Sequence, residues 1–130
     1  MDESATVRVV REAYDLARRS KHAELRPLLH EDVSWEPARE GIWKPCSNAD
    51  EVVRTLLFRA GVFRFRPAET LDLGDRVLVR LRGRAMVRLG ARGRLFPHLY
   101  QIWVVRGGKV ASIQDYPNRE QAHAAAGLHA

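Results

Sequence analysis

The hydrophobic pattern of this chain is mainly helical in its first half and strand-like in its second half, and that change limits the folds the chain can adopt. Up to Gly61, apolar residues mostly recur every three or four positions, whereas from Phe63 onward they form long strand-like runs broken by glycine turns. Helices that precede strands, instead of alternating with them, favour an α+β domain with helices on one face of a bent sheet. The order argues against a doubly wound fold.

Three helices are predicted in the first half from shared apolar faces and capping residues. The first lies between Ser4, its expected N-cap, and Ser20, the second covers residues 22–29, and the third follows Ser47 or Asn48 and extends to Gly61. Between the second and third, alternation over residues 32–36 predicts a strand, which Pro37 ends.

Four long strands and a closing helix are predicted after the third helix. The expected strands cover residues 63–72, 76–89, 95–105 and 110–116. They are separated by glycine-containing turns, as in an antiparallel meander. The alanine-rich residues 118–127 predict a short helix on or beyond the sheet.

Length and composition indicate one soluble domain spanning residues 1–130. The chain is 45% hydrophobic and 29% charged, and 22 Lys and Arg against 16 Asp and Glu give a net charge of +6. Cys46 is its single cysteine, so no intramolecular disulfide can form and a reducing compartment fits. The first twenty residues lack a signal-peptide pattern, and the apolar stretch 95–105 is too short to span a bilayer, so we expect a cytoplasmic protein without membrane contact.

The arginines do not form the pattern expected of a nucleic-acid binder. They recur along the whole chain and are interleaved with acids. The exception is the stretch 76–94, in which Arg76 is followed by six further arginines and which contains no acid. Arg80, Arg82 and Arg84 alternate with smaller or apolar residues, so they share one sheet face. A solvated outer face or a homodimer contact is expected there, because an RNA surface would carry aromatic side chains among the arginines.

Three local patterns resemble the SnoaL-like polyketide cyclase branch of the nuclear transport factor 2-like (ketosteroid isomerase-like) superfamily. They are LLHEDVSW at 28–35, GGKV at 107–110, and DYPNREQA at 115–122 followed by AGL at 126–128. The resemblance covers nearly the whole chain. It implies a cone-shaped half-barrel, made of a strongly bent and mostly antiparallel sheet with three helices of the N-terminal half on its concave face. A hydrophobic pocket would lie between sheet and helices. This fold hosts isomerases, cyclases, dehydratases, epoxide hydrolases and non-catalytic proteins, so it fixes no function.

His98, Tyr100 and Asp115 are the first candidates for catalysis. Alternation places His98 and Tyr100 on one face of their strand, together with Ile102, and we assign this face to the pocket. In SnoaL-like cyclases the base is an aspartate near the end of the last strand, so the resemblance nominates Asp115. The structural alternatives are a histidine and a tyrosine that are simply buried and satisfied, and an aspartate that accepts backbone hydrogen bonds beside a turn.

Glu36 and Tyr14 form a second candidate set. Glu36 precedes a proline at the end of the first strand, a place similar to that of the base aspartate in ketosteroid isomerases. Tyr14 matches the oxyanion tyrosine of those enzymes, and Tyr100 replaces the acid that partners it there. With Glu36 as base and the two tyrosines as donors, proton abstraction next to a carbonyl is conceivable.

Aromatic residues could line the pocket, although they are more often ordinary core. The candidates for contact with a ligand are Trp35, Trp43, Phe58, Phe63 and Ile102. The histidines show no HxH or HExxH spacing, and there is no phosphate loop, so we expect neither metal nor cofactor.

The sequence thus predicts a small-molecule enzyme or ligand-binding protein that uses cofactor-free acid/base chemistry on an apolar, carbonyl-bearing compound. The alternative is a non-catalytic ligand-binding or association module that forms a homodimer through its sheet. An open cavity with uncommitted polar groups would favour the enzyme, and a solidly packed interior would favour the module.

Overall fold

The computed structural model describes residues 4–38, 44–83 and 99–128 of the chain. The elements, in chain order, are α1 (Ala5–Arg18), α2 (His22–Leu25), a 3₁₀ turn (Arg26–Leu28), β1 (Leu29–Glu36), α3 (Ala49–Val62), β2 (Arg66–Asp72), β3 (Arg76–Arg82), β4 (Leu99–Arg106), β5 (Lys109–Tyr116) and α5 (Arg119–Ala125). This order of helices and strands confirms the predicted one. The parts of two predicted strands within residues 84–98 lie outside the described residues.

The five strands form one mixed sheet in the order β1-β5-β4-β3-β2. β1 and β5 are parallel, and the other three pairs are antiparallel. Gly107 and Gly108 join β4 to β5 with φ values of 59° and 79°, a left-handed backbone that glycine adopts without strain. In the β4–β5 register Gln101 lies opposite Asp115. That pairing brings the two polar side chains to the same sheet face.

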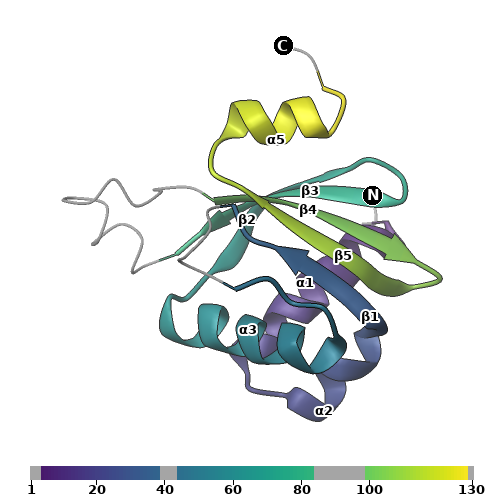
Figure 1. The fold of residues 1–130 in the computed structure, drawn as a ribbon, viewed down its shortest axis with the longest axis vertical. Helices are drawn as coiled ribbons and strands as arrows, with labels where there is room; N and C mark the ends of the chain where they lie inside the picture. Colours follow the sequence, from purple (N-terminus) through teal and green to yellow (C-terminus); the bar gives the residue numbers. More distant parts are fainter. Residues whose placement is uncertain (1–3, 39–43, 84–98, 129–130) are drawn as a thin grey trace.

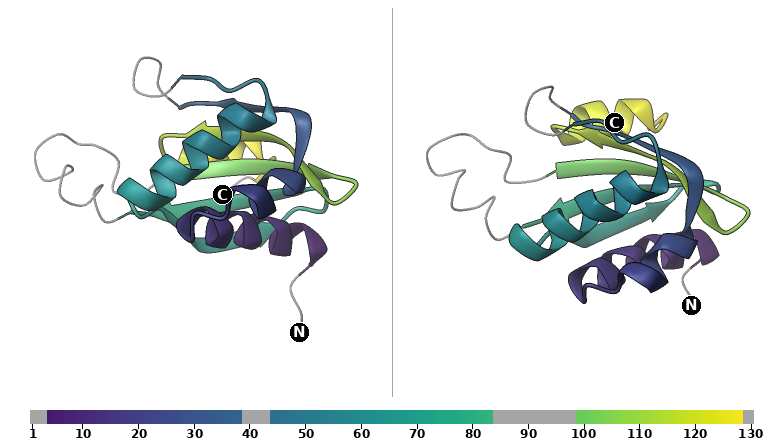
Figure 2. Two further views of the ribbon diagram at one scale, coloured as in Figure 1. Left: turned by 90° about the horizontal axis from the view of Figure 1, so that it is seen from below. Right: turned by 60° about the horizontal axis from the view of Figure 1, so that its bottom comes forward.

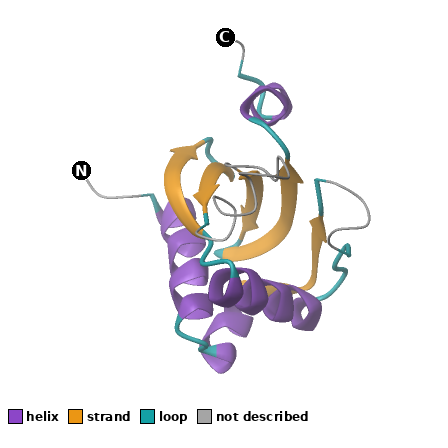
Figure 3. Cartoon of the chain, turned by 90° about the vertical axis from the view of Figure 1, so that its left-hand side faces the viewer, coloured by secondary structure: helices purple, strands orange, loops and turns teal. Residues whose placement is uncertain are grey.

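The helices lie on both sides of this sheet, but unequally. Helices α1, α2 and α3 pack on one face, and α5 lies on the other (Figures 1 and 2). The strands curve around the three helices (Figure 3), which gives the open α+β cone expected from the sequence. We call the side that faces α1 and α3 the inner face and the side that faces α5 the outer face.

Each face of the sheet has its own hydrophobic core. The inner core joins the three helices to the sheet and contains fully buried Tyr14, Trp35 and Trp103. The outer core is smaller and joins α5 to the sheet through Ala122, Ala126, Leu78, Tyr100 and Ile102. The central strand β4 is therefore covered on both sides, as its apolar sequence indicates.

Side-chain caps fix where three of the helices begin. Ser4 Oγ accepts a hydrogen bond from the Val7 amide at 3.1 Å, Asn48 Oδ1 accepts from the Glu51 amide at 2.9 Å, and Asn118 Oδ1 accepts from the Gln121 amide at 2.8 Å. These interactions satisfy backbone N–H groups that a helix start leaves unpaired. The expected cap at Ser4 is confirmed, and of the two alternatives for α3 the structure selects Asn48.

The second helix is shorter than predicted. It ends at Leu25, a 3₁₀ turn containing Pro27 follows, and β1 begins at Leu29. Pro27 has no N–H for an α-helical hydrogen bond, so the chain tightens there and then extends. No helix of the described residues is long and apolar enough to span a membrane.

Candidate functional site

A carboxylate lies at the centre of the inner face. Asp115 comes from the end of β5 and is 1% exposed. Its Oδ1 accepts hydrogen bonds from Trp35 Nε1 at 2.9 Å and Gln101 Nε2 at 2.8 Å, and its Oδ2 accepts one from Arg59 Nη1 at 2.9 Å. Every described partner is an N–H donor, which suits an ionised carboxylate. Asp115 is therefore held as an acceptor in the interior of the protein.

Arg59 supplies the opposite charge. It comes from α3, is 1% exposed, and forms with Asp115 an ion pair in which both side chains are buried. Its guanidinium lies over the Trp35 ring, 4.3 Å from the ring centroid. The indole of Trp35 thus contacts both charges, Arg59 through its face and Asp115 through its N–H.

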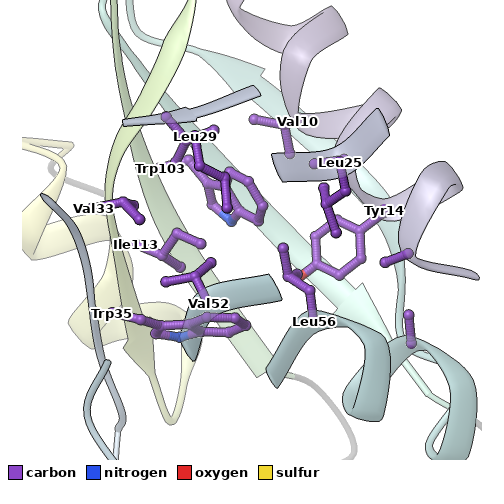
Figure 4. Close-up of a cluster of buried hydrophobic side chains, with 14 of the residues drawn as sticks. Val10, Tyr14, Leu25, Leu29, Val33, Trp35, Val52, Leu56, Trp103 and Ile113 are labelled. Atoms are coloured by element: carbon purple, nitrogen blue, oxygen red, sulfur yellow. The ribbon is translucent and has the colours of Figure 1, made fainter. Parts of the chain in front are cut away.

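Gln101 links this ion pair to the first helix. Its Oε1 accepts hydrogen bonds from the Tyr14 hydroxyl at 2.6 Å and from Trp103 Nε1 at 2.8 Å. Two donors on Oε1 fix the orientation of the amide, which directs Nε2 toward Asp115. Figure 4 shows the rings of Tyr14, Trp35 and Trp103 converging on this interior region from α1, β1 and β4.

Burial raises the pKa of the Tyr14 hydroxyl well above its usual range. The Arg59 charge opposes this increase, the Asp115 charge adds to it, and the hydrogen bond to Gln101 lowers the pKa again. Desolvation is the largest of these effects. Tyr14 therefore remains a neutral hydrogen-bond donor over the range in which most proteins are folded.

The arrangement leaves capacity for one more interaction at Asp115. A carboxylate has about four lone-pair positions, and three are occupied by donors from the described residues. The remaining position is on Oδ2, beside Arg59 Nη1. That position lies next to a fixed positive charge, and the side chain of Asp115 is 0% exposed.

Tyr100 and Ile102 lie on the outer face, which corrects the predicted pocket face. The inner face of β4 instead carries Leu99, Gln101 and Trp103. Both faces of β4 are apolar, because α5 covers the outer one, so alternation identifies two faces without showing which one meets the three helices. The predicted cooperation of Tyr14 with Tyr100 in one site is wrong, since the sheet separates them.

The second candidate base is also outside this region. Glu36 is exposed and follows the buried Trp35 along β1, so the two side chains point to opposite faces. The predicted set of Glu36 with Tyr14 is therefore not assembled. Phe58 is 49% exposed, whereas Phe63 is partly buried against the inner core. His98 and Trp43 lie outside the described residues.

Two members of the buried network were not predicted. Arg59 lies three positions after Leu56 and seven after Val52, which places a cation on the apolar stripe of the third helix. Gln101 is the polar residue on an otherwise apolar strand face. A charged or amide side chain on a buried face signals a buried partner, and both residues could have been found by this criterion.

No three acidic, histidine or cysteine side chains cluster as a possible metal site in residues 4–38, 44–83 and 99–128. Cys46 is buried, its Sγ lies 3.3 Å from Thr55 Oγ1, and burial raises the pKa of its thiol. Neither Cys46 nor Thr55 forms a described hydrogen bond with Asp115.

Comparison with known proteins identifies the fold. No family model matches the sequence, and no curated protein is similar enough in sequence to match. Among solved structures, a candidate polyketide cyclase from Sinorhizobium meliloti is 19% identical, with a TM-score of 0.59 over 82% of this chain and 92% of that one. A candidate ketosteroid isomerase from Kribbella flavida is 17% identical, with a TM-score of 0.66 over 88% and 78% of the two chains.

A third solved structure adds a different chemistry on the same architecture. It is an LEH-like epoxide hydrolase from M. tuberculosis, 15% identical, with a TM-score of 0.62 over 88% of this chain and 79% of that one. At these identities the likeness concerns the fold. The chain therefore has the nuclear transport factor 2-like fold, shared with polyketide cyclase-like and ketosteroid isomerase-like proteins, as the sequence patterns indicated.

Proposed function

We propose that this protein is a small-molecule enzyme that uses Asp115 as a general base, without a cofactor, on an apolar compound that carries a carbonyl group. The observation that carries the proposal is the buried carboxylate, 1% exposed, paired with Arg59 on the inner face of the sheet. A base surrounded by protein instead of water needs little solvent reorganisation when it accepts a proton.

The proposed step is proton abstraction from the carbon next to the carbonyl. The C–H bond breaks, its proton goes to Oδ2 of Asp115, and its electron pair forms an enolate on the substrate. Nearby N–H donors then stabilise the negative charge of the enolate. Arg59 is the cation beside Oδ2, and Gln101 has a second amide hydrogen that no described residue accepts. With a saturated ketone, return of the proton to the same carbon exchanges it with solvent. With a β,γ-unsaturated ketone, the enolate is a dienolate, and return of the proton at the γ-carbon moves the double bond and completes an isomerisation.

Tyr14 has a positioning role in this proposal. Its hydroxyl donates to Gln101 and not to Asp115, so it acts on the site through the amide that it orients. Trp35 forms one wall of the site, with its N–H on Asp115 and its ring beneath Arg59. The base is Asp115 and not Glu36, because Glu36 is exposed on the opposite side of its strand.

The test is exchange of α-protons for deuterium in deuterium oxide, followed by NMR on apolar ketones such as cyclohexanone and acetophenone. General base catalysis typically contributes about 100-fold or more to a rate, so Asp115→Asn should lower the catalysed exchange by at least about that factor. Asp15→Asn makes the same chemical change at an exposed ion pair of α1 and should leave the rate unchanged.

Because Asp115→Asn leaves Arg59 without its counter-charge, the double variant with Arg59→Met provides a second folded protein that lacks the base. Circular dichroism confirms folding before each assay. Exchange that persists at the wild-type rate in either folded variant would remove Asp115 from the mechanism. Absence of catalysed exchange by the wild-type protein across the ketone panel would remove the proposed reaction.

The alternative function is association of two copies through the outer face of the sheet, without catalysis. It is favoured by Leu71 on β2, an apolar residue that is 45% exposed. The helix on this face, α5, makes its main contacts with β4 and β5 rather than with β2. Sedimentation equilibrium distinguishes the two: a Leu71→Lys variant should become monomeric if this face forms a homodimer.

A further inference from the structure

A hollow lies on the outer face of the sheet, away from the site at Asp115. Its volume is about 350 Å³, within the range of pockets for small ligands. It is lined by β2, β3, β4 and α5, and the position of α5 above the sheet is visible in Figure 1. Nothing in the proposed reaction uses it.

The floor of this hollow is apolar. Leu78 and the Tyr100 ring are 6% and 8% exposed and belong to the outer core, and Leu71 lies at its β2 side. Ala122 of α5 and Ala126, which follows that helix, pack in the same outer core. An apolar molecular body can rest on this floor and displace water from it.

Three of the polar side chains around the floor have no described partner. The side chains of Arg119, His123 and Tyr100 line the hollow, and among the described residues none of the three forms a side-chain hydrogen bond or an ion pair. Tyr100 offers a hydroxyl and Arg119 a guanidinium. His123 offers one N–H donor and one acceptor nitrogen when its imidazole is neutral. Donors that converge on one cavity suit a ligand rich in acceptors.

The charge of the lining is positive. Its one acid, Glu69, is paired with Arg80 at 3.0 Å, so those two charges offset each other. Arg119 remains, and a guanidinium binds a carboxylate with two parallel hydrogen bonds. The protein as a whole carries +6, which attracts anions at long range.

We propose that this hollow is a binding site for a small monocarboxylate with an apolar body, its carboxylate held by Arg119, His123 and Tyr100 and its body resting on Leu71 and Leu78. The site is separate from Asp115, because the sheet lies between Tyr100 on the outer face and Gln101 on the inner one. The proposal does not depend on the proposed reaction.

Titration of the isotopically labelled protein with benzoate and octanoate, followed by amide chemical shifts, tests the site. Saturable shifts should concentrate at residues 69–71, 78–80, 100 and 119–123. Benzyl alcohol, which has a similar ring and no charge, should bind at least tenfold more weakly. Arg119→Gln should weaken benzoate binding at least tenfold, and Tyr100→Phe should weaken it severalfold while keeping the ring of the floor.

Arg106→Gln is the matched control, because it removes one exposed cation from the end of β4 and lowers the net charge equally. Benzoate affinity should be unchanged in that variant. Equal weakening by Arg106→Gln and Arg119→Gln would show general attraction to a basic surface and would overturn the proposal. So would the absence of saturable shifts at millimolar benzoate or octanoate.

The association alternative gives a distinct result in the same experiments. If a second copy covers this face, sedimentation will show a dimer, and the amides of β2 and α5 will be protected without added carboxylate. Binding of neither probe to that dimer would assign the hollow to the dimer interface and overturn its role as a ligand site.

Discussion

Asp115 is the one buried acid among the described residues, and its three nitrogen donors come from three different elements. Its position near the end of the last strand was indicated by resemblance, but its partners were not. In the sequence, Arg59 and Gln101 lie in an otherwise apolar helix stripe and an otherwise apolar strand face. The sequence shows that they are polar on buried faces, yet it cannot show that those faces meet, because their contact spans long separations along the chain.

Removing the charge of Asp115 should destabilise the protein strongly. Asp115→Asn leaves the buried Arg59 guanidinium without a counter-charge and turns an amide N–H toward it, which typically costs about 3–5 kcal/mol. Urea unfolding followed by circular dichroism measures this loss. Asp15→Asn should lower the free energy of unfolding far less, since that ion pair is exposed.

A double-mutant cycle distinguishes the ion pair from simple packing. If the cost comes from an uncompensated charge, adding Arg59→Met to Asp115→Asn should restore part of the lost stability. Additive destabilisation in the double variant would show that the two residues stabilise the protein independently.

Tyr14 should make stability fall at alkaline pH. The raised pKa means that the folded protein retains the hydroxyl proton where the unfolded chain releases it, which happens above about pH 10. The unfolded state then binds fewer protons, so the free energy of unfolding decreases as the pH rises.

The contribution of Tyr14 is the difference between wild type and Tyr14→Phe. That difference should be constant below about pH 10 and should decrease by about 1.4 kcal/mol per pH unit above it. Denaturant unfolding at a series of pH values measures it. Parallel curves for the two proteins across this range would show that Tyr14 is not desolvated.

At the scale of elements, the helices and strands were predictable where capping and turn residues mark their ends. Ser4, Asn48 and Asn118 begin helices, and Gly107 and Gly108 form the β4–β5 turn. The assignment of sheet faces was not predictable in the same way. On β4 the two faces are nearly equally apolar, so the position of Tyr100 depends on α5, a helix whose docking side the alternation does not specify.

Replacing two glycines, Gly61 and Gly83, by alanine should change the free energy of unfolding in opposite directions. A Cβ at Gly83 would overlap the Phe65 ring and lie 2.9 Å from the Phe63 carbonyl oxygen, so Gly83→Ala should cost about 1–3 kcal/mol. Gly61 is inside α3 with no atom within 4 Å of an added Cβ, so Gly61→Ala should stabilise the protein by about 0.5–1 kcal/mol. Urea unfolding of both variants gives the two signs.

Loss of stability in Gly61→Ala would contradict the helical, unobstructed position assigned to it. An unchanged free energy of unfolding in Gly83→Ala would contradict the close approach of β3 to the residues that follow α3.

At the scale of the whole molecule, one sheet separates two chemically different regions. The inner face holds a balanced ion pair and its donors within a large core, whereas the outer face holds a basic hollow beside a short helix. The order of helices and strands predicted an α+β domain with helices on one face of a bent sheet, and the resemblance to the nuclear transport factor 2-like superfamily implied the cone. Placement of the chemistry depended on pairings between β4 and β5 and between α3 and β5, which only the structure reveals.

The most direct measurement for the central claim is the position of a bound ketone relative to Asp115. It would come from a crystal structure of the Asp115→Asn variant in complex with a ketone that wild type exchanges. We predict that the α-carbon of the ketone lies within about 3–3.5 Å of the side-chain atom that replaces Oδ2. A ketone bound elsewhere, with residue 115 still enclosed by Trp35, Gln101 and Arg59 alone, would contradict the role of Asp115 as the base.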